Sequence, residues 1–194
     1  MQKKLIILTG PQGSGNHLWS KIFSKHPDVN GWRMKTYWEG HHHEPFSKWW
    51  DDPSLISETE YQFNFTSISC PYIRNQLPQI PKYHEFIKKA KAFYDVKLVV
   101  ISRDQNILKT QQERVRGEHT APKFLRELSS LTPDFFLSTE SLFLYQDKYL
   151  EYVSKELDFP ILTGNSYADT NKKYIQSVGP QPLDSEVKVA IHES

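Results

Sequence analysis

Apolar positions follow two different periods along the chain, and the N-terminal segment shows the change most clearly. Residues 5–8 form an unbroken apolar run, which is typical of a strand buried on both faces. Apolar side chains then recur at helical spacing from Leu18 to Phe23. The pattern therefore predicts a strand over residues 4–9, a loop, and a helix over residues 16–25.

The same two periods predict the remaining elements. We expect strands at 61–69, 95–102, 134–138 and 159–162, and helices at 83–94, 106–116 and 147–157. Because helices alternate with strands, the predicted fold class is α/β, a three-layer α/β/α arrangement with a central parallel sheet of the P-loop nucleotide-binding kind. We expect one domain over residues 1–194, with an irregular excursion or lid over residues 28–60. The tail after about residue 178 has no strong pattern.

Three glycines, Gly10, Gly13 and Gly15, occupy the loop between the first strand and the first helix. Glycine permits a tight turn, and a helix that starts near Asn16 directs its unpaired N–H groups at the loop, so we expect an anion site made of backbone. The glycine spacing also fits half of a nucleotide P-loop, but Asn16 and His17 stand where Lys and Ser or Thr belong. Kinase-type use of magnesium and ATP is therefore disfavoured. A glycine-rich turn that binds nothing is the alternative.

Composition limits the partners. The 24 Lys and Arg residues against 23 Asp and Glu residues give a net charge of +1, so we expect no broad binding of nucleic acid. The single cysteine permits no intrachain disulfide, and the chain shows no convincing metal-ligand spacing. No stretch reaches the length of a membrane span, and we expect no signal peptide because the predicted first strand begins at residue 4. We expect a cytoplasmic protein without a metal or a membrane partner.

Four segments resemble, in order and spacing, those of sulfotransferases that use 3′-phosphoadenosine 5′-phosphosulfate (PAPS). Residues 10–18, Gly-Pro-Gln-Gly-Ser-Gly-Asn-His-Leu, resemble the sulfate-donor loop, and residues 24–29, Ser-Lys-His-Pro-Asp-Val, resemble the His-Pro segment of carbohydrate and protein sulfotransferases. Residues 99–104, Val-Val-Ile-Ser-Arg-Asp, are similar to the strand that presents an Arg to the 3′-phosphate. Residues 136–142 resemble the late strand and helix. The resemblance spans roughly residues 4–160.

This resemblance implies transfer of a sulfuryl group from PAPS, as co-substrate, to a hydroxyl or amine, by chemistry that requires no metal. Loop amides would hold the 5′-phosphosulfate, and an Arg with a neighbouring polar side chain would hold the 3′-phosphate. The implied donor-binding residues are Gln12, Gly13, Ser14, Gly15, Asn16, His17, Arg103, Thr110 and Gln111.

Two positions depart from the family pattern. The loop Lys or Arg of the family is replaced by residues 12–13, Gln-Gly, so the cation is missing or comes from elsewhere. The family's 3′-phosphate Ser is replaced by Gln111, with Thr110 beside it, and a Gln can still donate a hydrogen bond. The candidates for a replacement cation are His17, Lys35 and Lys109.

The resemblance also places the general base in the excursion after the His-Pro segment. A His with a pKa near neutrality, or a Glu whose pKa is raised by burial, can accept the proton of the attacking group. We favour Glu44 and His43 as catalytic residues, and the alternative for each is a solvated loop residue. His17, in the donor loop, is a third candidate. A metal site over residues 41–44 is disfavoured because adjacent residues rarely all face one ion.

The acceptor is the least constrained partner. Four tryptophans between Trp32 and Trp50 suit a lid or an acceptor groove, and core packing explains them about as well. We expect a small-molecule or carbohydrate acceptor. Two other functions stay open: a non-catalytic nucleotide-binding protein of the same fold, and a P-loop kinase-like phosphotransferase.

Overall fold

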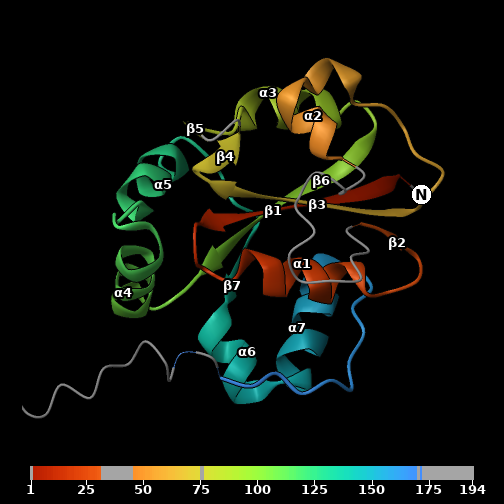
Figure 1. The fold of residues 1–194 in the computed structure, drawn as a ribbon. Coiled ribbons are helices and arrows are strands. Elements are labelled where there is room, and N and C mark those ends of the chain that lie inside the picture. The colour runs from red at the N-terminus through yellow and green to blue at the C-terminus, as the bar shows by residue number, and fades with distance from the viewer. Residues whose placement is uncertain (1, 32–45, 75–76, 170, 172–194) are drawn as a thin grey trace, which may run out of the picture.

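Five parallel strands form the centre of this computed structural model, which describes residues 2–31, 46–74, 77–169 and 171 (Figure 1). The strands are β1 (Lys3–Pro11), β2 (Val29–Asn30), β3 (Phe63–Cys70), β6 (Tyr94–Ser102) and β7 (Phe135–Ser138). Their order in the sheet is β2-β3-β1-β6-β7, so β1 lies at the centre. Its partners run parallel to it, with Leu8 opposite Ser67 of β3 and Val99 of β6.

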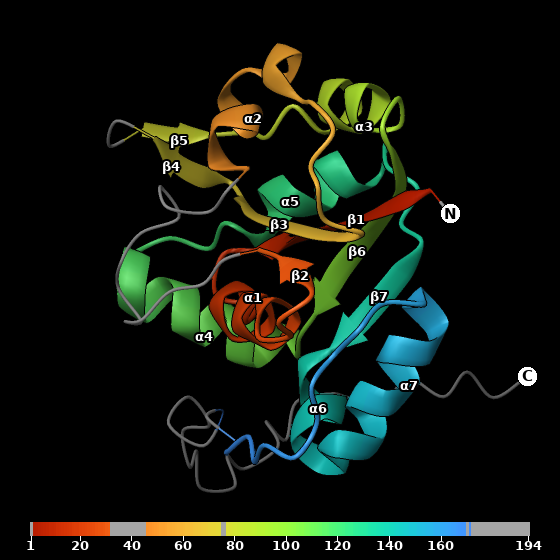
Figure 2. The same ribbon diagram turned by 90° about the vertical axis from the view of Figure 1, so that its right-hand side faces the viewer.

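Helices cover both faces of the sheet (Figures 1 and 2). One face carries α1 (Asn16–Ser24), α6 (Thr139–Tyr145) and α7 (Asp147–Leu157). The other carries α2 (Ser47–Asp51), the 3-10 turn η2 (Pro53–Leu55) and α3 (Tyr83–Ala90). The predicted α/β class with three layers and a central parallel sheet is confirmed.

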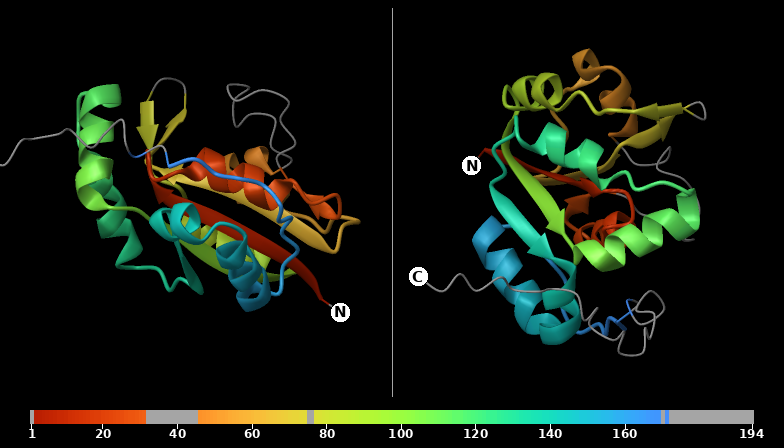
Figure 3. Two further views of the ribbon diagram at one scale, coloured as in Figure 1. Left: turned by 90° about the horizontal axis from the view of Figure 1, so that it is seen from below. Right: turned by 90° about the vertical axis from the view of Figure 1, so that its left-hand side faces the viewer.

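Three further elements lie toward the carboxyl ends of the strands, at the left of Figure 1. They are α4 (Gln105–Arg116), α5 (Ala121–Leu128) and an antiparallel hairpin of β4 (Tyr72–Arg74) with β5 (Leu77–Gln79). In the right-hand view of Figure 3, α4 and α5 follow one another across this end of the sheet. They therefore border the edge at which a parallel sheet binds its ligands.

Alternate side chains of β1 supply both halves of the core. Ile6 and Leu8 pack with Trp19 of α1 and with α6 and α7, whereas Leu5 and Ile7 pack with α2, α3 and α5 on the opposite face. Such two-sided burial explains why the sequence of this strand is a continuous apolar run rather than an alternating one. It also fixes where β1 ends and hence where the glycine loop lies.

Two predicted elements are corrected by the structure. The helix predicted over residues 83–94 ends at Ala90, and Tyr94 already begins β6. The strand predicted over residues 159–162 is wrong, because this segment forms no strand. Phe159 instead packs its ring against Phe23 and Phe63, with ring centroids 5.9 and 5.5 Å away, so the apolar run is buried without joining the sheet.

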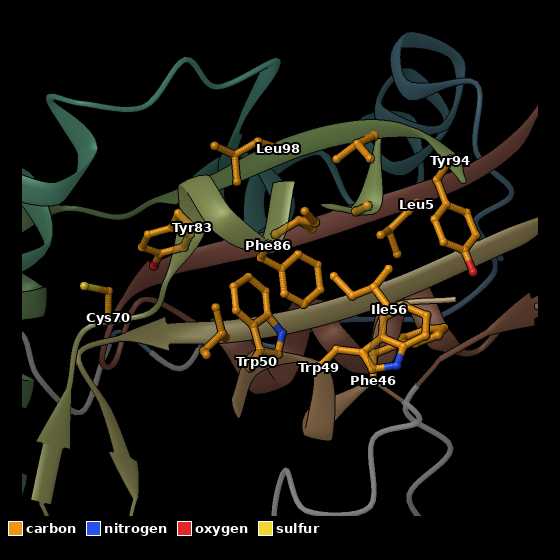
Figure 4. Close-up of a cluster of buried hydrophobic side chains, with 14 of the residues drawn as sticks. Leu5, Phe46, Trp49, Trp50, Ile56, Cys70, Tyr83, Phe86, Tyr94 and Leu98 are labelled. Atoms are coloured by element: carbon orange, nitrogen blue, oxygen red, sulfur yellow. The ribbon is translucent and has the colours of Figure 1, made fainter. Parts of the chain in front are cut away.

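The excursion predicted over residues 28–60 is partly regular, since β2, α2 and η2 lie within it. Trp50 stacks on Phe86 at 3.8 Å between ring centroids (Figure 4). Its Nε1 donates a hydrogen bond to Thr66 Oγ1 at 2.9 Å. Trp49 is buried in the same cluster. These two tryptophans are therefore core residues rather than a lid or an acceptor groove. Trp32, Trp38 and the predicted tail lie outside the described residues.

We find no candidate membrane-spanning helix in the part of the chain described above. None of its helices combines the length and the apolar character that crossing a bilayer demands.

Candidate anion-binding site

The candidate site lies where the connections of two neighbouring strands diverge. The chain leaves β1 through α1 toward β2 on one side of the sheet, and it leaves β6 toward β7 on the other. Ligands of open α/β sheets bind in the crevice that such a divergence creates at the carboxyl ends of the strands. The glycine loop follows β1, and Arg103 follows β6, so both predicted anion-binding features meet here.

The loop backbone takes conformations that require glycine. Gly13 and Gly15 have φ values of 84° and 109°, in the left-handed region that favours glycine. Gly10 is needed for a different reason, because a Cβ on it would lie 2.6 Å from Ser14 Oγ. Helix α1 starts at Asn16 with no side-chain cap and no acidic residue in its first turn. Its positive end therefore faces the loop.

All five carbonyl oxygens from Pro11 to Gly15 accept hydrogen bonds from the protein. The donors are Ser14 N and Asn16 Nδ2 to Pro11 (both 3.1 Å), Gln112 Nε2 to Gln12, Arg103 Nη1 to Gly13, Thr139 Oγ1 to Ser14 (3.0 Å) and Trp19 N to Gly15 (3.0 Å). In a trans peptide the N–H points away from the carbonyl of the preceding residue. The N–H groups of Gly13, Gly15 and Asn16 are consequently directed away from the groups that hold the carbonyls.

Arg103 connects this loop to α4. Its Nη1 donates to the carbonyl oxygen of Gly13 and to Oε1 of Gln111, and its Nη2 donates to Oδ1 of Asn171 at 2.7 Å. All three of these acceptors are uncharged oxygens. The structure thus brings Arg103, which precedes α4, beside Gln111 of α4, the pair that the resemblance assigns to the 3′-phosphate. Thr110 directly precedes Gln111 on α4 and is partly buried.

Asn16 occupies the position at which a nucleotide P-loop carries Lys. Its side chain is turned inward, where Nδ2 donates to the Pro11 carbonyl and to Ser14 Oγ at 3.2 Å. Its Oδ1 is buried and has no hydrogen-bond partner within the described residues. Gln12 and Ser14 are also buried, so the side chains at these three loop positions bring no charge to the site.

The predicted cation substitutes and bases are only partly described. His17 lies on the first turn of α1 and is partly exposed. Lys109 is exposed on α4, and its Nζ lies 4.0 Å from Oε1 of Glu113. Lys35, His43 and Glu44 lie outside the described residues. Among the residues that the structure does describe, no group of three or more His, Cys, Asp or Glu side chains could hold a metal ion.

Three further residues, Gln112, Thr139 and Asn171, contribute to the site, and none of them is predicted from the sequence. Gln112 and Thr139 hold two of the loop carbonyls, and Asn171 accepts from Arg103. Thr139 was accessible to prediction, because it directly follows β7 at the carboxyl edge of the sheet. Nothing in the local sequence distinguishes Gln112 from its neighbour Gln111.

A second buried polar cluster lies at the carboxyl end of β3. Thr9 Oγ1 donates to the Ile68 carbonyl at 2.8 Å and lies 2.6 Å from Tyr83 Oη, so the Tyr83 hydroxyl is the donor in that contact. Burial raises the pKa of the Cys70 thiol to about 11 and raises the pKa of Tyr83 well above its usual value. Both groups are therefore neutral near pH 7 and unsuited to act as nucleophiles.

Comparison with known proteins gives a structural likeness and no family assignment. No protein family and no curated protein matches the sequence. Among solved structures, the chain is similar to mouse sulfotransferase SULT7A1 complexed with PAP, with a TM-score of 0.42 and 11% sequence identity. The matched region covers 91% of this chain and 64% of that one, so it spans less than two thirds of the neighbour's length.

Proposed function

We propose that the chain is a sulfotransferase that moves a sulfuryl group from PAPS to a hydroxyl or amine of a small-molecule or carbohydrate acceptor. The observation that carries this proposal is the restraint of all five carbonyls from Pro11 to Gly15, which turns the loop into a cradle of N–H donors. A cradle of this kind, at the positive end of a helix, favours a sulfate or phosphate group. The resemblance of the four sequence segments supplies the identity of the ligand.

Two anion-recognising positions suit a nucleotide with two anionic groups. The loop amides would hold the 5′-phosphosulfate, and Arg103 with Gln111 would hold the 3′-phosphate. A guanidinium that exchanges an uncharged acceptor for a phosphate gains a hydrogen bond roughly twice as strong. Gly13 and Gln111 thus hold the Arg103 side chain at the site. Their hydrogen bonds are weaker than those that a phosphate would accept from it.

The reaction exchanges one bond to sulfur for another. An acceptor oxygen or nitrogen attacks the sulfur, the bond between the sulfur and the 5′-phosphate oxygen breaks, and adenosine 3′,5′-bisphosphate leaves. The acceptor loses its proton to a base, for which Glu44, His43 and His17 are our candidates. The loop N–H groups and the positive end of α1 would stabilise the negative charge that develops on the leaving phosphate.

Binding of adenosine 3′,5′-bisphosphate to the full chain, followed by calorimetry, tests the proposal. We expect a dissociation constant on the order of micromolar and a loss of affinity of at least about tenfold in Arg103→Ala. Arg126→Ala is the matched control, because Arg126 is exposed in the last turn of α5. Failure of the native protein to bind either this nucleotide or PAPS would overturn the proposal.

Nucleotide binding without transfer is a second candidate. It is favoured by the uncharged loop side chains of Gln12, Ser14 and Asn16, which bring no cation to the transferring group. Transfer of labelled sulfate from PAPS to a panel of alcohols, sugars and amines separates the two functions, because turnover on any acceptor eliminates the second. A phosphotransferase is disfavoured by the inward position of Asn16, so magnesium-ATP should not displace the bisphosphate.

A further inference from the structure

The buried side chain of Gln112 makes three hydrogen bonds. Its side chain is 1% exposed, its Nε2 donates to the carbonyl oxygen of Gln12, and its Oε1 accepts from the N–H groups of Thr120 at 2.8 Å and Ala121 at 3.1 Å. The Thr120 side chain itself does not cap α5. The oxygen of Gln112 therefore caps α5, while its nitrogen reaches the loop.

The bond to Gln12 determines the direction of the peptide group between Gln12 and Gly13. In a trans peptide, a carbonyl that points toward α4 places the following N–H on the opposite side. Gly13 has φ +84° and no Cβ to restrict it, so this peptide group is held by its partners more than by its own torsional preferences. Gln112 is the side chain that holds it through the carbonyl of Gln12.

We propose that Gln112 is a positioning residue of the anion site. Through the Gln12 carbonyl it directs the N–H of Gly13 toward the bound anion, and through its own oxygen it connects the loop to the start of α5. The identity of the anion as the 5′-phosphosulfate side of PAPS rests on the proposed function. The positioning role itself applies to any sulfate or phosphate held by the loop. Gln112 touches neither the nucleotide nor the acceptor in this proposal and acts only through the Gln12 carbonyl.

Gln112→Glu separates the two roles of the side chain. A glutamate keeps an oxygen for Thr120 and Ala121, but it replaces the N–H donor with an oxygen that faces the Gln12 carbonyl. Gln112→Met has similar length and removes both roles, so it supplies a second variant if the buried carboxylate prevents folding. Glu113→Gln, at the exposed neighbouring position, is the control.

The measurement compares two nucleotides in each variant. Adenosine 3′,5′-bisphosphate places a phosphate in the loop, whereas adenosine 3′-monophosphate does not. We expect Gln112→Glu and Gln112→Met to lose about tenfold or more in affinity for the bisphosphate and to keep the affinity for the monophosphate within about twofold. An equal loss for both nucleotides, or no loss for either, would contradict the positioning role.

A titration with inorganic sulfate, followed through the backbone ¹H–¹⁵N resonances, tests the same role without a nucleotide. We expect sulfate to shift the Gly13 resonance in the native protein and not in Gln112→Glu or Gln112→Met. If the native protein binds neither nucleotide and this sulfate difference persists, the proposed function fails and the positioning role stands. If sulfate shifts Gly13 equally in native and variant proteins, or in neither, the positioning role is wrong.

Discussion

Thr139 donates a hydrogen bond from Oγ1 to the carbonyl oxygen of Ser14 at 3.0 Å, so the residue that follows the edge strand β7 holds the loop that follows the central strand β1. The same Oγ1 accepts from Trp19 Nε1 at 3.2 Å. Thr139 is 2% exposed, and each of these contacts is buried. The loop is therefore held from several separate elements, which fixes its shape before any ligand binds.

Replacing the Thr139 hydroxyl with a methyl group tests this support. Thr139→Val keeps the shape of the side chain but leaves the Ser14 carbonyl and the Trp19 indole without their buried partner. An unsatisfied buried group costs about 1–3 kcal/mol, so we expect the free energy of unfolding to fall by roughly 2 kcal/mol in urea titrations. Thr139→Ser keeps the hydroxyl and should lose less. A Thr139→Val variant that is as stable as the native protein would show that the hydroxyl does not support the loop.

Two glycines with similar backbone angles provide a matched pair. Gly13 and Gly117 have φ values of 84° and 73°, but a Cβ on Gly13 would lie 3.3 Å from Cδ of Gln111, whereas a Cβ on Gly117 meets nothing within 4 Å. Alanine in the left-handed region costs roughly 1–2 kcal/mol, so both substitutions should reduce stability. Only Gly13→Ala should also weaken binding of adenosine 3′,5′-bisphosphate. Calorimetry that finds the same affinity in both variants would show that the loop tolerates the displacement of Gln111.

The sequence predicts what depends on local pattern. The apolar run of residues 5–8 and the helical spacing after Leu18 predict β1 and α1 almost to their ends, and the rule for strand ends places the loop beside Arg103. The contacts that hold the loop are tertiary. Gln112 and Thr139 lie 100 and 125 residues from the carbonyls that they hold, and no local period carries that information.

Apolar side chains can be buried in more than one way, which explains why one predicted strand is wrong and why the role of the tryptophans stayed open. Residues 159–162 have the composition of a strand, yet this segment does not pair with the sheet. Phe159 is buried instead by packing its ring against Phe23 and Phe63. Trp50 likewise stands in a polar, aromatic stretch whose pattern does not distinguish core from groove. Its stacking on Phe86 is decided by the position of α2 above the sheet.

Trp50 should matter for stability and not for ligand binding. Trp50→Phe keeps an aromatic ring over Phe86 (Figure 4). It loses the Nε1 hydrogen bond to Thr66 Oγ1. We expect a loss of about 1–3 kcal/mol in the free energy of unfolding, with the dissociation constant for adenosine 3′,5′-bisphosphate unchanged. Thr66→Val, which removes the other partner, is the companion variant. A large loss of affinity in Trp50→Phe would show that Trp50 contributes to ligand binding.

Cys70 should resist chemical modification in the native protein. It is the single cysteine of the chain, it is buried, and its pKa is raised to about 11 by burial. Because the thiolate is the reactive form, a disulfide reagent at pH 8 should label Cys70 only as fast as the surrounding core opens. Labelling should accelerate steeply with added urea. Complete labelling within seconds in the absence of denaturant would show that the β3 end of the sheet is accessible.

The raised pKa of Cys70 also predicts how the stability of the protein changes at high pH. The ordinary pKa of 9.0 applies to Cys70 in the unfolded chain, and the native value is about 11. Between these values the unfolded state holds fewer protons than the native state, so stability is fully present below pH 9 and decreases as the pH rises toward 11. Burial of Tyr83, whose pKa is raised well above 10.0, acts in the same direction at higher pH.

Urea titrations at pH 7 and pH 10 test this prediction. The free energy of unfolding should fall less between these two pH values in Cys70→Ala than in the native protein, because the alanine has no proton to release. If both proteins lose the same free energy, ionisation of Cys70 does not contribute to alkaline unfolding.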